Sequence, residues 1–285
     1  MIKKIRYLVE AVFIYTFFGI SKIIGLSLSR KLFSFIFKMV GPVIRSNKIP
    51  LKNLDIFSKN ISISEKKKII SSMWSNYGKT FIEYVFLNKL RNNNSHIEVL
   101  GIDILDDIQK ENKPVIFISG HFANFELMSM EISKKEIDLA TIYRPLNNFF
   151  LNPLMEYLRR TFVCKNQIKK GLIGVKEAIK YINKKHSVAL MVDQRVSEGE
   201  KVKFFNEKAL TTTLPGQLAL KYNLDIVPIF IERHGCGFFK MKVHEPIKSS
   251  KFKDKIDLSE KLNRIIENMI SENPNQWIWT HNRWK

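Results

Sequence analysis

Strand-like and helix-like segments alternate along most of this chain. Short runs rich in β-branched and aromatic residues predict strands, at residues 97–100, 115–119, 139–144, 188–193, 226–232 and 238–244. Amphipathic stretches predict helices, at residues 63–88, 125–134, 152–160, 173–184, 213–222 and 258–271. This order predicts an α/β fold with a mostly parallel mixed sheet flanked by helices.

Three polar side chains stand where predicted strands end: His121, Arg144 and Asp193. In open sheets of this kind, the active groups lie beyond the carboxyl ends of the strands. The three residues are therefore candidates for a functional site.

The segment around His121 carries the most specific pattern. Gly120 allows a sharp turn after the strand, and Asn124 is a good helix N-cap. Glu126 follows His121 by five residues, so the two side chains can meet only if His121 lies in the turn and Glu126 in the first helical turn. A carboxylate in contact with the imidazole would fix its tautomer and make a general base that needs neither a metal nor a covalent nucleophile.

The alternative for His121 is a structural histidine at a strand end. The spacing by itself does not decide, because six histidines and 27 acidic residues in 285 make a chance pair common. The catalytic interpretation depends on the order of strand, glycine, histidine, short turn, acid and helix.

The net charge of +20 predicts an anionic partner, such as nucleic acid, an anionic membrane surface or an acidic carrier protein. A bias of the source genome toward lysine is the alternative. No helix-turn-helix, zinc finger, RNP motif or basic-aromatic stripe is present, so we do not expect nucleic-acid binding. No Gly-rich phosphate loop or Cys/His cluster occurs, so we expect neither ATP use nor a metal or other cofactor. Cys164 and Cys236 are expected to be buried, small apolar residues.

The N-terminal region predicts membrane attachment. Residues 1–6 are basic, residues 11–20 are apolar and uncharged, and an amphipathic stretch covers 26–40. The apolar run is shorter than the roughly 20 residues of a spanning helix, so an interfacial or oblique anchor is favoured. Residues 1–60 carry 11 Lys and Arg against two acids, as at a cytoplasmic membrane face. An ordinary core helix is the alternative.

Further motifs follow in a fixed order. They are Tyr143-Arg144-Pro145, Asp193-Gln194, Phe204-Phe205 and the tail Gln276-Trp-Ile-Trp-Thr-His-Asn-Arg-Trp-Lys285. Together with His-x4-Glu and the basic, apolar N-terminus, they resemble the bacterial lipid A biosynthesis acyltransferase family, the late lauroyl and myristoyl acyltransferases. The resemblance covers essentially the full length. The family has glycine where Asn206 follows Phe205, and Asn tolerates the left-handed conformation that such a turn needs.

The resemblance implies a glycerolipid-acyltransferase-like fold, with a membrane-anchoring helical segment at 1–45 and an acyltransferase domain at 46–285. It implies a site at the cytoplasmic face of the inner membrane and an acyl-carrier-protein thioester as the acyl donor. The implied acceptor is a hydroxyl of the lipid A precursor Kdo-lipid IVA. His121 and Glu126 match the catalytic pair, and Arg144, Asp193 and Gln194 match positions that we assign to substrate binding.

The chemistry of these residue types agrees with that assignment. His121 would take the hydroxyl proton and return it to the leaving thiolate, while Glu126 orients the ring. Arg144 suits an acceptor phosphate; Arg144 or backbone N–H groups near Gly120 would stabilise the oxyanion. No Ser or Cys lies in a nucleophile turn such as G-x-S-x-G, so we expect direct transfer without an acyl-enzyme.

Several alternatives stay open at this point. Arg144 could be a surface ion pair, and Asp193 could cap a strand end or pair with a basic side chain. The tryptophans of the tail are expected to pack in the core or at a membrane interface. A related acyltransferase with another glycolipid or phospholipid acceptor is the competing enzyme, and a basic, membrane-anchored binding protein is the competing non-enzyme. Only an enzyme would release free carrier thiol.

Overall fold

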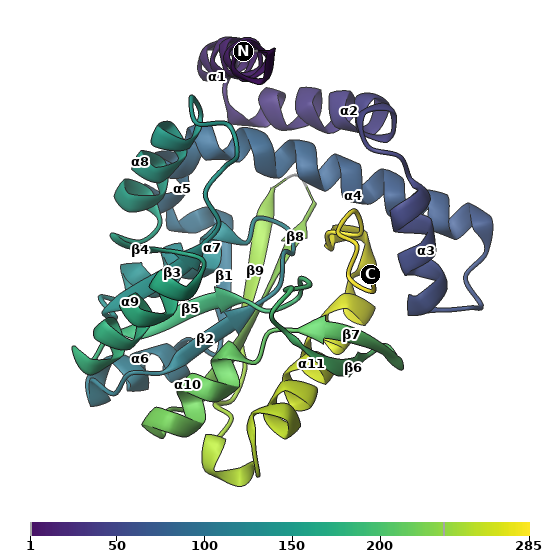
Figure 1. Cartoon of the computed structure of the whole chain (residues 1–285). Helices are drawn as coiled ribbons and strands as arrows, with labels where there is room; N and C mark the ends of the chain where they lie inside the picture. The colour runs from purple at the N-terminus through teal and green to yellow at the C-terminus, as the bar shows by residue number, and fades with distance from the viewer. Residues whose placement is uncertain (1, 236) are drawn as a thin grey trace.

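The computed structural model describes residues 2–235 and 237–285, and its centre is a seven-stranded sheet (Figure 1). The strand order is β1-β9-β8-β2-β5-β3-β4, and every neighbouring pair is parallel except β8 and β9. The strands are β1 Ile97–Leu100, β2 Ile116–Ser119, β3 Leu139–Tyr143, β4 Asn166–Lys169, β5 Ser187–Met191, β8 Ile226–His234 and β9 Phe238–Val243. The predicted mostly parallel mixed sheet is confirmed.

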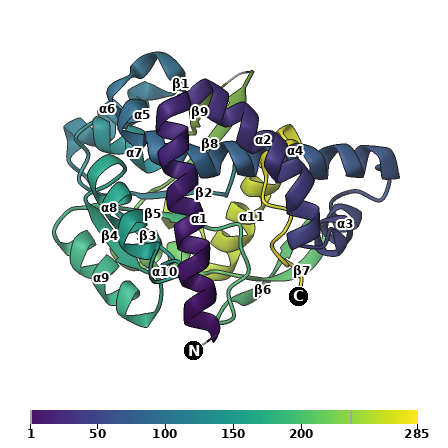
Figure 2. The same ribbon diagram turned by 90° about the horizontal axis from the view of Figure 1, so that it is seen from above.

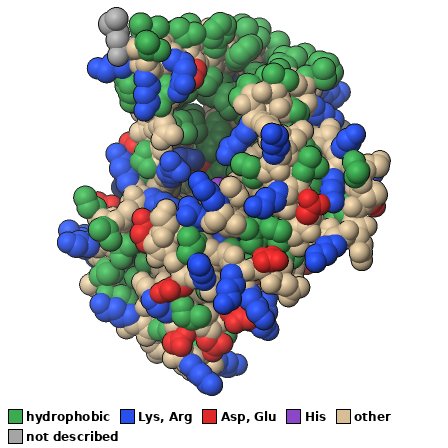
Figure 3. Space-filling view, turned by 45° about the vertical axis from the view of Figure 1, so that its right-hand side comes forward, with side chains coloured by type: hydrophobic (Ala, Val, Ile, Leu, Met, Phe, Trp, Pro, Cys, Tyr) green, Lys and Arg blue, Asp and Glu red, His purple; other side chains and the backbone are tan. Residues whose placement is uncertain are grey.

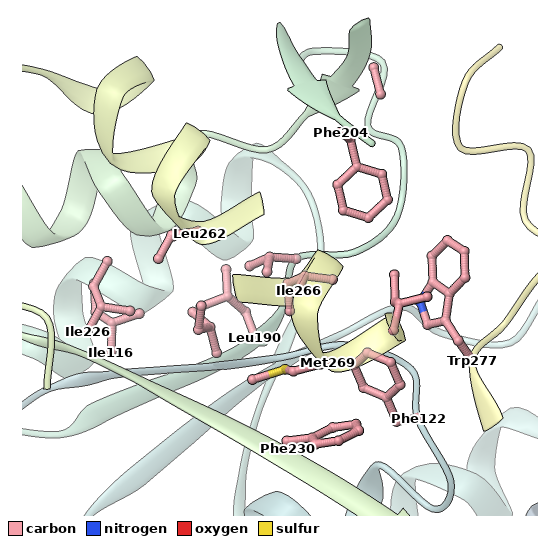
Figure 4. Packing of buried hydrophobic residues seen from close by; sticks show 14 of the residues in the cluster. Ile116, Phe122, Leu190, Phe204, Ile226, Phe230, Leu262, Ile266, Met269 and Trp277 are labelled. Atoms are coloured by element: carbon pink, nitrogen blue, oxygen red, sulfur yellow. The ribbon is translucent and has the colours of Figure 1, made fainter. Parts of the chain in front are cut away.

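Helices cover both faces of this sheet. They are α5 Leu87–Asn92, α6 Ile102–Glu111, α7 Glu126–Lys134, α8 Asn152–Phe162, α9 Leu172–Asn183, α10 Leu214–Tyr222 and α11 Lys255–Glu272. All four residues of strand β2 are buried. Because alternate side chains point to opposite sides of the sheet, both faces of the strand are covered. Ile116 and Ile118 join the core under α9, α10 and α11, part of which Figure 4 shows, while Phe117 joins the core under α5 to α8.

Several short elements escaped the sequence pattern. They are α3 Lys48–Phe57, α5, α6, β4 and the hairpin of β6 Glu200–Phe204 and β7 Glu207–Thr211. The helix predicted at 63–88 is α4 Ile63–Glu83, followed by a 3₁₀ turn and α5. Phe205 and Asn206 both have positive φ, so the left-handed Asn206 expected at this turn is present. Cys164 is buried as predicted, whereas Cys236 lies outside the described residues.

Two N-terminal helices lie over the domain. Helix α1 Ile2–Ile24 crosses it and α2 Leu26–Ile44 runs along α4 (Figures 1 and 2). By length and composition, helix α1 is long and apolar enough to cross a membrane. Many large apolar side chains on the two helices are exposed, including Ile2, Phe13, Ile23, Phe35, Val43 and Ile44.

A buried ionic cluster joins α2 to the sheet. Glu83, at the end of α4, is fully buried. It accepts hydrogen bonds from Arg30 of α2 at 2.6 Å, Arg233 of β8 at 3.0 Å and Asn124 at 2.9 Å. Burial raises the pKa of Glu83, but the two arginines outweigh burial and lower it. The carboxylate therefore stays charged and connects an apolar N-terminal helix to the turn after β2.

Replacing Glu83 tests this cluster. We expect Glu83→Ala to lower the free energy of unfolding by about 3–5 kcal/mol, because two buried arginines lose their counter-charge. Glu260→Ala, which breaks the exposed pair with Arg264, is the control and should cost less than about 1 kcal/mol. Urea unfolding of both variants followed by circular dichroism measures the difference. Equal costs for the two variants would show that the cluster contributes no more than a surface pair.

Candidate active site

The register of two neighbouring strands brings His121 and Asp193 together. Strands β2 and β5 are parallel neighbours, and Ser119 pairs with Met191. His121 and Asp193 each follow two residues after these partners, so they leave the same edge of the sheet side by side. The sequence placed both residues at strand ends, and the strand order makes them neighbours.

Asp193 holds the imidazole of His121. Asp193 Oδ1 lies 2.8 Å from His121 Nδ1, and Oδ2 accepts the backbone N–H of His121 at 2.9 Å and the indole N–H of Trp277 at 2.8 Å. Burial raises the pKa of Asp193, but the charge and hydrogen bonds of His121 and the bond from Trp277 hold it at about 2. The carboxylate is therefore ionised at neutral pH and keeps the proton of the imidazole on Nδ1, which leaves Nε2 as a base.

The same ionisation contributes to stability over a defined pH range. An unfolded aspartate titrates near a pKa of roughly 3.9, above the folded value of about 2. Asp193 therefore stabilises the fold above pH 4 or so, and this contribution is lost as the pH falls toward 2.

The turn after β2 is built for this contact. A Cβ on Gly120 would lie 2.6 Å from the ring of Phe122 and 3.2 Å from Asp193 Cγ, so a larger residue would push the carboxylate away. Ala123 has φ of 41°, a left-handed conformation that is unfavourable for alanine. Its carbonyl accepts the hydroxyl of Thr80 at 2.8 Å, and its N–H donates to the carbonyl of Gln276 at 3.3 Å. Neighbouring elements thus hold the strained turn in place.

The predicted contact of Glu126 with His121 is not present. Glu126 begins α7, and its Oε1 accepts from Tyr84 at 2.5 Å and from two nitrogens of Arg159 at 2.9 and 2.6 Å. Among the residues that the structure describes, no hydrogen bond joins Glu126 to His121. The carboxylate points toward α8 instead, where Arg159 binds it. The imidazole is paired with an acid, as expected, but with a different one.

His121 and Glu126 nevertheless line one cleft of about 240 Å³, with Arg144, Gln194 and Arg159. Figure 3 shows the surface hollowed below the apolar side chains of the N-terminal helices, with Lys and Arg side chains around the hollow. Two of the three residues assigned to substrate binding, Arg144 and Gln194, therefore line the same cleft as the imidazole. Asp193 is fully buried, does not line this cleft and pairs with His121, which agrees with the alternative left open for it, a pair with a basic side chain.

Positive side chains gather in this cleft. Arg144, Lys170 and Arg195 all line it. Burial and the charge of Arg144 lower the pKa of Lys170, as expected where cations face one another. Within the described residues, no ion pair with a carboxylate neutralises Arg144 or Lys170. The cleft is therefore suited to an anionic ligand.

Residues near the C-terminal end complete the site, and the sequence pattern did not assign them there. Trp277 and Trp279 are fully buried and pack in the core, as predicted, but Trp277 also binds Asp193. His281 lines the cleft, and Arg159 and Tyr84 hold Glu126. The aromatic motif of the tail was the only signal noted in the sequence, and a motif does not indicate which residues its side chains contact.

Comparison with known proteins identifies the protein family. The sequence model of the bacterial lipid A biosynthesis acyltransferase family matches residues 2–285, and the chain belongs to that family. The resemblance noted in the sequence is thereby confirmed.

Two curated relatives show how far the chain has diverged. It is 25% identical over 251 residues to the lipid A biosynthesis lauroyltransferase of Escherichia coli K12 and 24% identical over 250 residues to the palmitoleoyltransferase of the same strain. Each alignment covers 85% of this chain and 79% of the relative.

A solved structure of a 1-acyl-sn-glycerophosphate acyltransferase from Thermotoga maritima aligns with 89% of this chain and all of its own, at 13% identity and a TM-score of 0.43. Because this similarity is low, the α/β assignment depends on the strand order described above.

Replacing Asp193 tests its role. We expect Asp193→Asn to reduce acyl transfer by up to about 10⁴-fold, because an amide can donate to Nδ1 and so favour the tautomer that protonates Nε2. Asp106→Asn, which neutralises the exposed partner of Lys135, is the control and should leave the rate unchanged. The measurement is the transfer rate, with thermal unfolding to verify the fold. A well-folded Asp193→Asn protein with a normal rate would exclude this role.

Proposed function

We propose that this protein transfers a fatty acyl chain from an acyl-carrier-protein thioester to a hydroxyl of the lipid A precursor Kdo-lipid IVA. Membership of the lipid A acyltransferase family supports the proposal. The observation that carries the mechanism is the imidazole of His121, fixed on its Nδ1 side by Asp193 and lining the cleft.

The reaction needs one proton to move twice. The acceptor hydroxyl attacks the thioester carbonyl carbon while His121 Nε2 takes the hydroxyl proton, and the carbonyl π electrons move to oxygen. When the tetrahedral intermediate collapses, the C–S bond breaks, the thiolate takes the proton from His121, and the new ester remains. The ionised Asp193 stabilises the imidazolium that exists between these steps.

In this proposal Glu126 acts indirectly, by holding Arg159 in the wall of the cleft. Its carboxylate balances the charge of Arg159, which is largely buried and also contacts Tyr84 at 3.1 Å. Burial lowers the pKa of Arg159, but Glu126 and Tyr84 outweigh burial and raise it. We therefore assign Glu126 as a positioning residue that fixes a cation close to the imidazole.

The surroundings of Cys164 favour direct transfer without an acyl-enzyme. The thiol is buried, points to the carbonyl of Leu139 at 3.2 Å, and has a pKa raised by burial. A thiol with a raised pKa is a poor nucleophile. The state of Cys164 therefore supports direct attack by the acceptor hydroxyl in this proposal.

We also propose that the N-terminal segment, residues 1–45, anchors the protein at the cytoplasmic face of the inner membrane. The exposed apolar side chains of α1 and α2 support this. The basic cleft would then face two acidic partners, the acyl carrier protein and the phosphorylated headgroup.

An assay with purified protein tests the function. Incubated with acyl-carrier thioester and Kdo-lipid IVA, the wild-type protein should add one acyl chain to the lipid and release free carrier thiol. His121→Ala should lower the rate about 10²–10⁴-fold because the general base is lost. His234→Ala, at a partly exposed histidine at the end of β8, is the control. Mass spectrometry of the lipid and a thiol assay measure both products.

The possible outcomes separate the candidate functions. Transfer only to a glycerophospholipid would replace the proposed acceptor. The absence of thiol release with any acceptor would favour a binding protein without catalysis. A well-folded His121→Ala protein with a normal rate would show that His121 is structural.

Arg144 tests the recognition of phosphate. We expect Arg144→Ala to raise the KM for the lipid acceptor roughly 10- to 100-fold, because a charge-assisted contact to phosphate is lost. The value of kcat should change little. Arg264→Ala, an exposed arginine on α11, is the control. Steady-state kinetics with a phosphorylated and a dephosphorylated acceptor measure the effect, and an equal rise in KM for both acceptors would contradict phosphate recognition.

Removing α1 tests the membrane anchor. The structure favours a deletion of residues 2–24, because α2 supplies Arg30 to the buried cluster and is needed for the fold. We expect the shortened protein to move from the membrane fraction to the supernatant, since the exposed apolar surface of α1 is removed. Release of the full-length protein by high salt alone would instead mean that charge holds it. If the shortened protein stayed fully in the membrane fraction, α1 would not be part of the anchor.

A further inference from the structure

A second histidine lies in the active-site cleft in a fixed orientation. His281, in the tail after α11, lines the same cleft as His121 and is half-buried. Its backbone is held on both sides, since its N–H donates to the carbonyl of Ile278 at 3.3 Å and its carbonyl accepts Asn53 Nδ2 at 2.7 Å. Its ring nitrogen Nε2 accepts the backbone N–H of Arg195 at 2.8 Å. The ring therefore cannot turn without losing this bond.

The bond from Arg195 also sets the protonation of the ring. A nitrogen that accepts an N–H carries no proton, so the neutral ring of His281 carries its proton on Nδ1. Burial lowers the pKa of His281 to about 4; the charge of Asp193 opposes this and that of His121 adds to it. At neutral pH the side chain is thus an uncharged N–H donor.

In the part of the chain that the structure describes, this donor has no acceptor of its own. Across the described residues, no hydrogen bond engages His281 Nδ1, and the atom is not sealed in the interior, unlike the buried unpartnered nitrogens of His96. A preoriented donor that lines a reaction cleft and has a free N–H is a candidate for contact with substrate.

Three backbone donors of the turn after β2 are already engaged. The N–H of His121 binds Asp193, that of Phe122 binds the carbonyl of Gly120 at 2.9 Å, and that of Ala123 binds Gln276. Backbone groups of this turn were one of the two sources of oxyanion stabilisation that the sequence left open. The other, Arg144, is exposed and better placed for a charged headgroup.

We propose that the Nδ1–H of His281 donates a hydrogen bond to the carbonyl oxygen of the acyl thioester and stabilises the oxyanion of the tetrahedral intermediate. This proposal rests on the acyl transfer proposed above. As the acceptor hydroxyl adds to the carbonyl carbon and His121 takes its proton, negative charge develops on that oxygen. The hydrogen bond from His281 strengthens as this charge develops, and His281 keeps its proton. The two histidines thus have opposite roles, one as base and one as fixed donor.

Two substitutions separate this role from a structural one. Asparagine places an N–H near the Nδ1 position but removes the acceptor for Arg195, whereas glutamine places an oxygen near Nε2 but removes the donor. We expect His281→Gln to lower kcat about 10²–10³-fold with KM nearly unchanged, and His281→Asn to stay within about tenfold of wild type. A purely structural histidine predicts the reverse order.

The assay is the transfer of acyl chains from carrier thioester to Kdo-lipid IVA by the full-length protein, with thermal unfolding as the folding control. A His281→Gln protein with normal kcat overturns the proposal and leaves acyl transfer standing. Equal losses in the two variants also overturn it. If wild type releases no thiol while binding the thioester, the proposed function itself has failed.

A spectroscopic measurement covers the case in which a variant does not fold. ¹⁵N NMR of the wild-type protein labelled on histidine reports which ring nitrogen carries the proton. We expect His281 to be neutral and protonated on Nδ1 at pH 7. Protonation on Nε2, or a charged ring, would overturn the proposal without any substitution.

Discussion

The chemistry of this protein depends on the carboxylate of Asp193 staying charged inside the protein. An unpaired charge at this depth would be strongly destabilising, and three hydrogen-bond donors stabilise the carboxylate. Two donors come from the turn after β2 and one from the indole of Trp277, near the end of the chain. The site therefore exists only when the sheet, the turn and the C-terminal tail are assembled together.

Much of the fold could be predicted from the sequence, because alternating apolar runs and amphipathic stretches are local patterns. Strand ends were predicted for the same reason, and they placed His121 and Asp193 correctly. Strand order is not local: β2 and β5 are neighbours although two other strands separate them along the chain. A reading of spacing therefore joined His121 to Glu126, five residues away, and missed Asp193, which lies beside it.

The strands that escaped prediction share a physical cause. Strand β4 has four residues and mixes polar with apolar ones, while β6 and β7 have five residues each and combine exposed charged side chains with buried ones. Segments this short repeat the pattern only once or twice and therefore leave a weak periodic signal. The roles of Trp277 and His281 were hidden for another reason. Each role depends on a hydrogen bond between one ring nitrogen and a residue far away in the sequence, Asp193 for Trp277 and Arg195 for His281.

The cluster around Glu83 affects how mutations in this protein are interpreted. Arg30 sits on a helix with an apolar outer face, yet the carboxylate that it binds also holds Asn124, whose side chain accepts the N–H of Glu126 at 3.3 Å. Substitutions on the inner face of α2 should therefore disturb the active-site turn although they lie outside the cleft. In a screen for loss of activity, such positions would be mistaken for substrate contacts unless folding were measured separately.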